Sequence, residues 1–123
     1  MPADRPVAVI DLFAGPGGLG EGFAALGTPR GSPKFKIRLS IEKDPLAHQT
    51  LELRAFFRHF EHGGAPEDYY RFLRGQLSRE NLFDAWPIAA NTARAEACCA
   101  KPGAAEWADV RGAVHDMIGK GSE

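Results

Sequence analysis

The stretch that most constrains the fold is Val7–Phe23, which reads VAVIDLFAGPGGLGEGF. Its first four residues, Val7–Ile10, are apolar and predict a buried strand. Asp11 and an apolar triplet follow, and then come five glycines within eight residues. Glycine permits positive φ angles and a close approach of the backbone to a ligand. A strand, a glycine-rich turn and an apolar helix in this order are typical of a nucleotide-binding βαβ unit, whose helix N-terminus offers free N–H groups.

The glycine-rich stretch also resembles a known family motif. DLFAGPGGLGEGF, residues 11–23, is similar to the first signature motif of the DNA cytosine-5 methyltransferases, D-L-F-x-G-x-G-G-x-x-x-G-F, at every fixed position. In that family the motif binds S-adenosylmethionine. The resemblance implies that this cofactor contacts eight residues here: Asp11, Phe13, Ala14, Gly15, Pro16, Gly17, Gly18 and Leu19. The alternative is a tight strand–helix turn without a ligand, but such a turn does not need five glycines.

A second strand is predicted at Phe35–Ile41, because FKIRLSI alternates apolar and polar residues. Glu42 follows at its carboxyl end, twenty-two residues after Gly20. A carboxylate there can accept hydrogen bonds from both ribose hydroxyls of a nucleoside lying across the glycine turn, and the resemblance implies the same role. Lys43 stands where the family often has an aromatic or apolar residue against the adenine, and its aliphatic stem can cover the ring edge. The alternative for Glu42 is a solvated carboxylate at the end of a strand.

Length and composition limit the chain to one ordinary globular domain at most, with 123 residues and a net charge of −1. It therefore has no basic field that would attract nucleic acid by itself. No apolar run approaches the length of a membrane span, and the N-terminal residues lack a secretory stretch. The two cysteines, Cys98 and Cys99, are adjacent and are not expected to pair. A reduced, cytoplasmic setting is the expectation.

Helical patterns dominate the remainder of the chain. After the glycine turn we expect a helix over 19–26, ended by Gly27, and a second helix over 45–60 that starts at Asp44-Pro45. The apolar stripe of this second helix is predicted to be core. It consists of Leu46, Leu53, Phe57 and Phe60, with Phe56 beside them. Residues 66–99 read as helical throughout, with one helix started by Pro66, another capped by Ser78 and a third begun by Pro87. A last helix is expected over 105–118. The histidines do not have the spacing of a metal site.

The resemblance divides the chain into two parts. Residues 1–60 are predicted to be the S-adenosylmethionine-binding βαβ start of a methyltransferase domain, and residues 61–123 a helical insertion and truncated end. Small family members carry an Asp near the adenine amino group on their third strand. Asp109 is the only late candidate here, and it falls in a helical pattern. Aromatic and basic residues are mixed near Tyr69, Tyr70 and Arg71, a combination that can contact nucleic acid. Packed aromatic rings with solvated arginines are the commoner outcome and are expected here.

The catalytic motifs of the family are missing. Its Pro-Cys motif supplies a thiolate that attacks carbon 6 of a flipped-out cytosine, and this sequence contains no such dipeptide. Cys98 and Cys99 lie in a helical pattern without a preceding proline, so no catalytic residue is assigned. The resemblance thus implies the N-terminal part of an enzyme that methylates carbon 5 of cytosine in DNA. This chain alone is expected to be inactive, with DNA as a partner only of the full-length enzyme.

Two other functions remain open. Gly15–Gly20 also satisfies G-x-G-x-x-G with Glu42 as the ribose acid, as in NAD- or FAD-dependent oxidoreductases. In that motif, however, the first glycine usually follows the strand directly, whereas Asp11–Ala14 intervene here. The other alternative is a non-catalytic module that binds a nucleoside or a protein.

The expected fold is α/β. We predict a truncated Rossmann-like methyltransferase fold, with two parallel strands, joined by a right-handed crossover, followed by a helical insertion. Two strands leave a sheet edge unpaired. The chain is therefore expected to be marginally stable or to self-associate.

Overall fold

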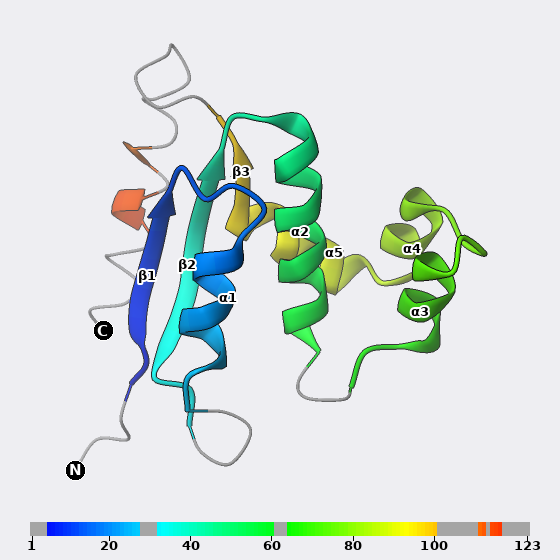
Figure 1. The fold of residues 1–123 in the computed structure, drawn as a ribbon, viewed down its shortest axis with the longest axis horizontal. Coiled ribbons are helices and arrows are strands. Elements are labelled where there is room, and N and C mark those ends of the chain that lie inside the picture. Colours follow the sequence, from blue (N-terminus) through cyan, green and yellow to red (C-terminus); the bar gives the residue numbers. More distant parts are fainter. Residues whose placement is uncertain (1–4, 28–31, 61–63, 101–110, 113, 117–123) are drawn as a thin grey trace.

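The computed structural model describes residues 5–27, 32–60, 64–100, 111–112 and 114–116. In chain order the elements are β1 (Val7–Leu12), α1 (Gly18–Ala25), β2 (Phe35–Glu42), α2 (Pro45–His59), α3 (Glu67–Leu73), α4 (Arg79–Ala85), α5 (Pro87–Glu96) and β3 (Ala97–Cys99). The three strands form a parallel sheet in the order β1-β2-β3. This α/β arrangement is consistent with part of a Rossmann-like fold. Figure 1 shows α3 and α4 on the side of α2 that faces away from β1.

The predicted starts of the helices after β2 are confirmed by their caps. The Asp44 carboxylate accepts a hydrogen bond from the Leu46 N–H at 3.0 Å, and Pro45 occupies the first helical position. Ser78 caps α4 by accepting from the Asn81 N–H at 3.0 Å. Gly27 follows α1 with φ +94°, a conformation that glycine adopts without strain. Local sequence signals therefore set these helix boundaries.

A third strand corrects the prediction of two. The helix expected to run through residue 99 ends at Glu96, and Cys98 and Cys99 lie on β3 beside β2. The reason is tertiary: β2 offers an open row of backbone groups, and pairing with it satisfies the backbone of a segment only three residues long. The last predicted helix lies mostly outside the described residues, within which 111–112 and 114–116 are helical.

A bulge in the sheet distributes the apolar residues of β2 over both faces. The register shifts between Val9 and Ile10, so Val9 pairs with Ile37 and Ile10 pairs with Leu39. Ile37 then lies against Gly20 of α1, whereas Leu39 packs with Ile10 and Val114. A strict period of two would have put Ile37 and Leu39 on the same face, and the extra residue changes this alternation.

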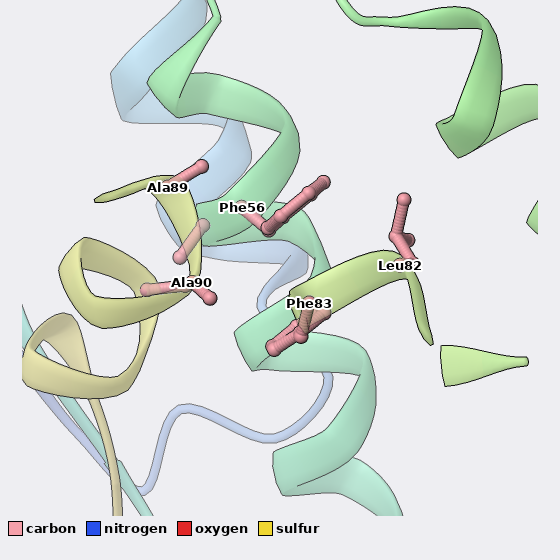
Figure 2. Close-up of a cluster of buried hydrophobic side chains, with 7 residues drawn as sticks. Phe56, Leu82, Phe83, Ala89 and Ala90 are labelled. Carbon is pink, nitrogen blue, oxygen red and sulfur yellow. The ribbon is translucent and has the colours of Figure 1, made fainter. Parts of the chain in front are cut away.

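The main core lies between α2, α4 and α5 rather than on the sheet. Figure 2 shows Phe56 among Leu82, Phe83, Ala89 and Ala90. The rings of Phe56 and Phe83 stack with centroids 4.8 Å apart. Small alanines on α5 allow that helix to approach α2 closely.

The predicted core stripe of α2 is wrong in part. Leu46 is 75% exposed and Phe57 is 37% exposed, whereas Leu51 and Ala55, which the stripe does not include, are buried together with Phe56. The buried face of α2 is therefore rotated relative to the prediction, because α5 and α4 cover that side. Among the described helices, none combines the length and apolar character needed to span a membrane.

Candidate cofactor site

The glycine turn is built by left-handed residues at the carboxyl end of β1. Phe13, Gly15 and Gly17 have φ angles of +62°, +59° and +98°. Phe13 is the only described non-glycine residue with a positive φ, and its side chain is 70% exposed. Backbone strain of this kind is concentrated at functional sites. The turn is fixed to the sheet because the Ala14 N–H donates to the Ile41 carbonyl at 2.9 Å.

Glu42 and Lys43 therefore lie at the same edge of the sheet as the turn. Leu12 is paired with Ile41, and Glu42 is the next residue of β2. Glu42 is half-buried, and no described residue forms a hydrogen bond or ion pair with its carboxylate. Lys43 is exposed. The structure thus places the two predicted parts of the site side by side, with the Glu42 carboxylate available to a ligand.

The first turn of α1 follows the glycines directly. Its N-cap is Gly17, which has no side chain to cap the helix, so the first N–H groups of α1 lack a side-chain partner. A Cβ on Gly18 would meet open space, whereas one on Gly20 would lie 3.0 Å from Ile37 Cδ1. Gly20 therefore serves helix–strand packing, and Gly18 leaves room above the turn.

Gly17 has a structural role as well. A Cβ there would lie 3.0 Å from Leu51 Cδ1 and 3.5 Å from Arg54 Cδ, both on α2. With its positive φ, this position is restricted to glycine whether or not a ligand is present. The turn is consequently packed against α2.

The other predicted contact residues surround this turn with differing exposure. Asp11 is half-buried, with its Oδ2 atom 3.9 Å from the place of a Cβ on Gly20, and burial raises the pKa of its carboxyl group. Ala14 is buried, Gly15 is half-buried and Pro16 is exposed. Leu19 is 70% exposed and, with Gly22, Phe23 and Leu26, lines an open apolar depression on α1. That depression lacks the polar groups that orient a nucleoside.

Strand β3 brings Cys98 and Cys99 to this edge of the sheet, opposite Ile41 and Glu42. The Ala100 N–H donates to the Glu42 carbonyl at 3.2 Å, and Cys99 Sγ is 3.8 Å from the Lys43 carbonyl oxygen. Burial raises the pKa of the Cys98 thiol, and Cys99 adds to the effect. A raised pKa disfavours the thiolate, which is the form in which a cysteine acts as a nucleophile. In the sequence, the short apolar run Ala97–Ala100 before Lys101-Pro102-Gly103 is the pattern that could have indicated this strand.

The mixed aromatic and basic region is neutralised by carboxylates. Arg71 pairs with Asp68 at 3.2 Å, Arg74 with Glu67 at 2.6 Å, and Arg79 with Glu52 at 2.9 Å. These pairs leave little positive charge for a phosphate backbone. Asp109, the candidate adenine contact, lies outside the described residues.

Comparisons with known proteins point to a methyltransferase. The chain is 38% identical over 74 residues to the type II methyltransferase M.Bpa9945I of Bacillus paralicheniformis. The match covers 60% of this chain but 15% of that protein. No family model and no solved structure matches the chain. The similarity supports a methyltransferase relationship.

The residues present fit S-adenosylmethionine, the cofactor that the sequence motif implies. A helix start with open space above Gly18 can receive its amino-acid end, and Glu42 on the neighbouring strand can accept from its ribose. The contacts predicted for individual residues stay predictions.

Proposed function

We propose that this chain is the S-adenosylmethionine-binding part of a DNA cytosine-5 methyltransferase. The observation that carries the proposal is the cytosine-5 signature, residues 11–23, forming a strand, glycine turn and helix with Glu42 beside it. Residues 1–60 would hold the cofactor, and residues 61–123 would contribute helices α3, α4 and α5 and the third strand of the sheet. Similarity to a type II methyltransferase supports the general class.

Each part of the site has a separate task in this proposal. N–H groups of the turn and of the first turn of α1 bind the carboxylate of the cofactor's amino-acid end. Glu42 accepts from the two ribose hydroxyls, while the stem of Lys43 and the exposed ring of Phe13 cover the base and the region near the sulfur. When bound, S-adenosylmethionine supplies the methyl group. The turn and Glu42 fix the position from which it leaves.

The chain itself lacks the group that would activate cytosine. Methylation at carbon 5 needs a nucleophile on carbon 6, and cysteine acts only as a correctly placed thiolate. The Cys98 thiol has a raised pKa, and the sequence contains no Pro-Cys. DNA would therefore be methylated only by an enzyme that adds this motif and a target-reading domain.

A labelling assay tests this division of tasks. The purified chain is incubated with methyl-labelled S-adenosylmethionine and duplex DNA, in parallel with DNA that carries 5-fluorocytosine to trap a covalent adduct. We expect cofactor binding but neither labelled DNA nor an adduct. Labelled DNA that disappears in a Cys98→Ser, Cys99→Ser double variant would show that these cysteines are catalytic.

The coding sequence after codon 123 tests the cytosine-5 assignment separately. An open reading frame encoding Pro-Cys within a few dozen codons is expected. A frame that instead encodes the motifs of an amino-group methyltransferase would contradict the assignment while leaving the cofactor unchanged.

A further inference from the structure

One guanidinium joins three helices around the candidate site. Arg58, in the last turn of α2, donates from Nε to Glu21 Oε1 and from Nη1 to Glu96 Oε1, each at 2.7 Å. Glu21 belongs to α1, and Glu96 is the last residue of α5. The Arg58 side chain is 21% exposed and that of Glu96 is 12% exposed. Two charge-assisted bonds to a mostly buried arginine have a defined geometry that a loose surface pair lacks.

The first bond reaches the glycine turn through a short path. Glu21 lies in the first turn of α1, and its N–H donates to the Gly17 carbonyl at 2.9 Å. Gly20 is the only buried residue described in α1. Leu19 of this helix and Leu26 just after it are exposed and do not anchor it. The Phe23 ring meets the Phe35 ring of β2 edge-on, with centroids 4.9 Å apart. With so little buried apolar surface, α1 depends more than a typical helix on its ionic link to α2.

The second bond reaches β3. Glu96 immediately precedes this strand, and His48 of α2 lies with its Nε2 atom 2.9 Å from the Ala97 carbonyl oxygen. The strand then runs beside the end of β2, where the Ala100 N–H donates to the Glu42 carbonyl. Arg58 is thus connected both to the turn and to the strand that borders Glu42.

We propose that Arg58 is a positioning residue that fixes the glycine turn relative to Glu42 by holding Glu21 and Glu96 at once. The inference rests on the proposed function as far as cofactor affinity is concerned. Its structural part, that α1 is held by Arg58, does not depend on any ligand. Both carboxylates are needed, because Glu21 belongs to the helix that follows the glycine turn, whereas Glu96 precedes the strand that lies beside Glu42.

The experiment compares two arginines of the full chain. Arg58→Met removes both bonds while keeping an unbranched apolar chain in place of the arginine stem. Arg79→Met is the matched control. Arg79 lies on α4 and pairs with Glu52 of α2, so this change breaks a similarly buried ion pair that does not involve α1. Arg58→Lys keeps the charge but not the forked geometry. Glu21→Gln weakens only the link to α1, and as a half-exposed residue it can be changed if Arg58→Met does not fold.

Two readouts are needed: affinity for S-adenosylmethionine by calorimetry, and amide hydrogen exchange of residues 21–25 of α1 in the free chain. For Arg58→Met we expect about tenfold weaker binding and about tenfold faster exchange in α1. Arg58→Lys should recover part of both changes, and Glu21→Gln should reproduce the faster exchange. Arg79→Met should change the affinity and the exchange rate in α1 by no more than about twofold, even if it lowers the melting temperature as much as Arg58→Met does.

Equal losses of affinity in Arg58→Met and Arg79→Met would overturn the inference, since they would reflect general destabilisation. Unchanged exchange in α1 in both Arg58→Met and Glu21→Gln would also overturn it. If the unsubstituted chain does not bind S-adenosylmethionine, the proposed function fails, and the exchange measurement still decides whether Arg58 holds α1.

Discussion

At the residue scale, the structure separates glycines that serve the fold from one that is free for a ligand. Gly17 and Gly20 lie against Leu51 and Ile37, so larger residues at either position would disturb packing before they affected binding. Gly18 has a normal φ and faces open space. Substitution at Gly18 is therefore the cleaner probe of cofactor approach.

Gly18→Ala should weaken cofactor binding without weakening the fold. Alanine in a helix is favoured over glycine by about 1 kcal/mol, so the melting temperature should rise or stay constant while affinity for S-adenosylmethionine falls. Gly22→Ala is the matched control, because this glycine is also helical, and a Cβ there likewise meets no atom. Calorimetry and thermal melts of both variants give the comparison. Equal affinity in the two variants would place the cofactor elsewhere.

At the scale of elements, the junction of α5 and β3 carries a buried charge. Burial raises the pKa of Glu96 above its usual value of 4.5, and the nearby charge of Arg58 offsets only part of this effect. The folded chain therefore holds a proton on Glu96 at pH values where the unfolded chain has lost it. Ionised Glu96 lowers stability as the pH rises from about 4.5 through the raised pKa.

Glu96→Gln should remove this pH dependence. The stability of the variant relative to the unsubstituted chain should increase as the pH rises through that window, because only the natural residue becomes charged. Urea unfolding of both chains at a series of pH values measures the difference. A stability difference that does not vary with pH would show that Glu96 ionises alike in the folded and unfolded chains.

The elements differ in how well the sequence predicted them. The first two strands and the helices after Asp44 and Ser78 follow local signals, namely apolar periodicity and side-chain caps, and their predicted bounds lie within two residues of those observed. The burial predicted for Val7–Ile10 is wrong, because the first two of these residues are exposed and the other two half-buried. Strand β3 was missed because its three residues depend on pairing with Ser40–Glu42 of β2, which lie 57 positions earlier in the chain. The bulge after Val9 is invisible in a pattern that alternates regularly.

The candidate site was predicted in the same uneven way. The turn and Glu42 came from the motif and its spacing, and the structure places them at the same edge of the sheet. No sequence pattern indicates a role for Arg58, because an arginine in a helix is usually solvated. Its partners Glu21 and Glu96 are 37 and 38 residues away along the chain. Such long-range ionic contacts become visible only when the helices are packed.

At the scale of the whole molecule, the outer edge of β1 is a further point of interest. Within the described part of the chain β1 pairs only with β2, and Val7 is 58% exposed. Its first four residues carry no charge. An apolar strand edge of this kind favours pairing with another chain, so we propose that the isolated chain self-associates as its concentration rises.

Val7→Lys should reduce this association, because a charge at a strand edge disfavours pairing between chains. Ile88→Lys is the control. Ile88 is 73% exposed and belongs to α5, far along the chain from β1. Sedimentation over a range of concentrations measures the mass of each chain. A concentration-independent monomer in the unsubstituted chain would contradict the proposal, as would equal effects of the two lysines.

The central claim is that the glycine turn and Glu42 bind S-adenosylmethionine, and titration calorimetry tests it most directly. S-adenosylmethionine and NAD are each titrated into the unsubstituted chain, Glu42→Ala and the control Glu80→Ala, whose carboxylate is exposed on α4. We predict binding of S-adenosylmethionine but not of NAD, a loss of roughly 1–3 kcal/mol in Glu42→Ala from two unpaired ribose hydroxyls, and unchanged affinity in Glu80→Ala. Preferential binding of NAD, or an affinity for S-adenosylmethionine that Glu42→Ala leaves unchanged, would contradict the account.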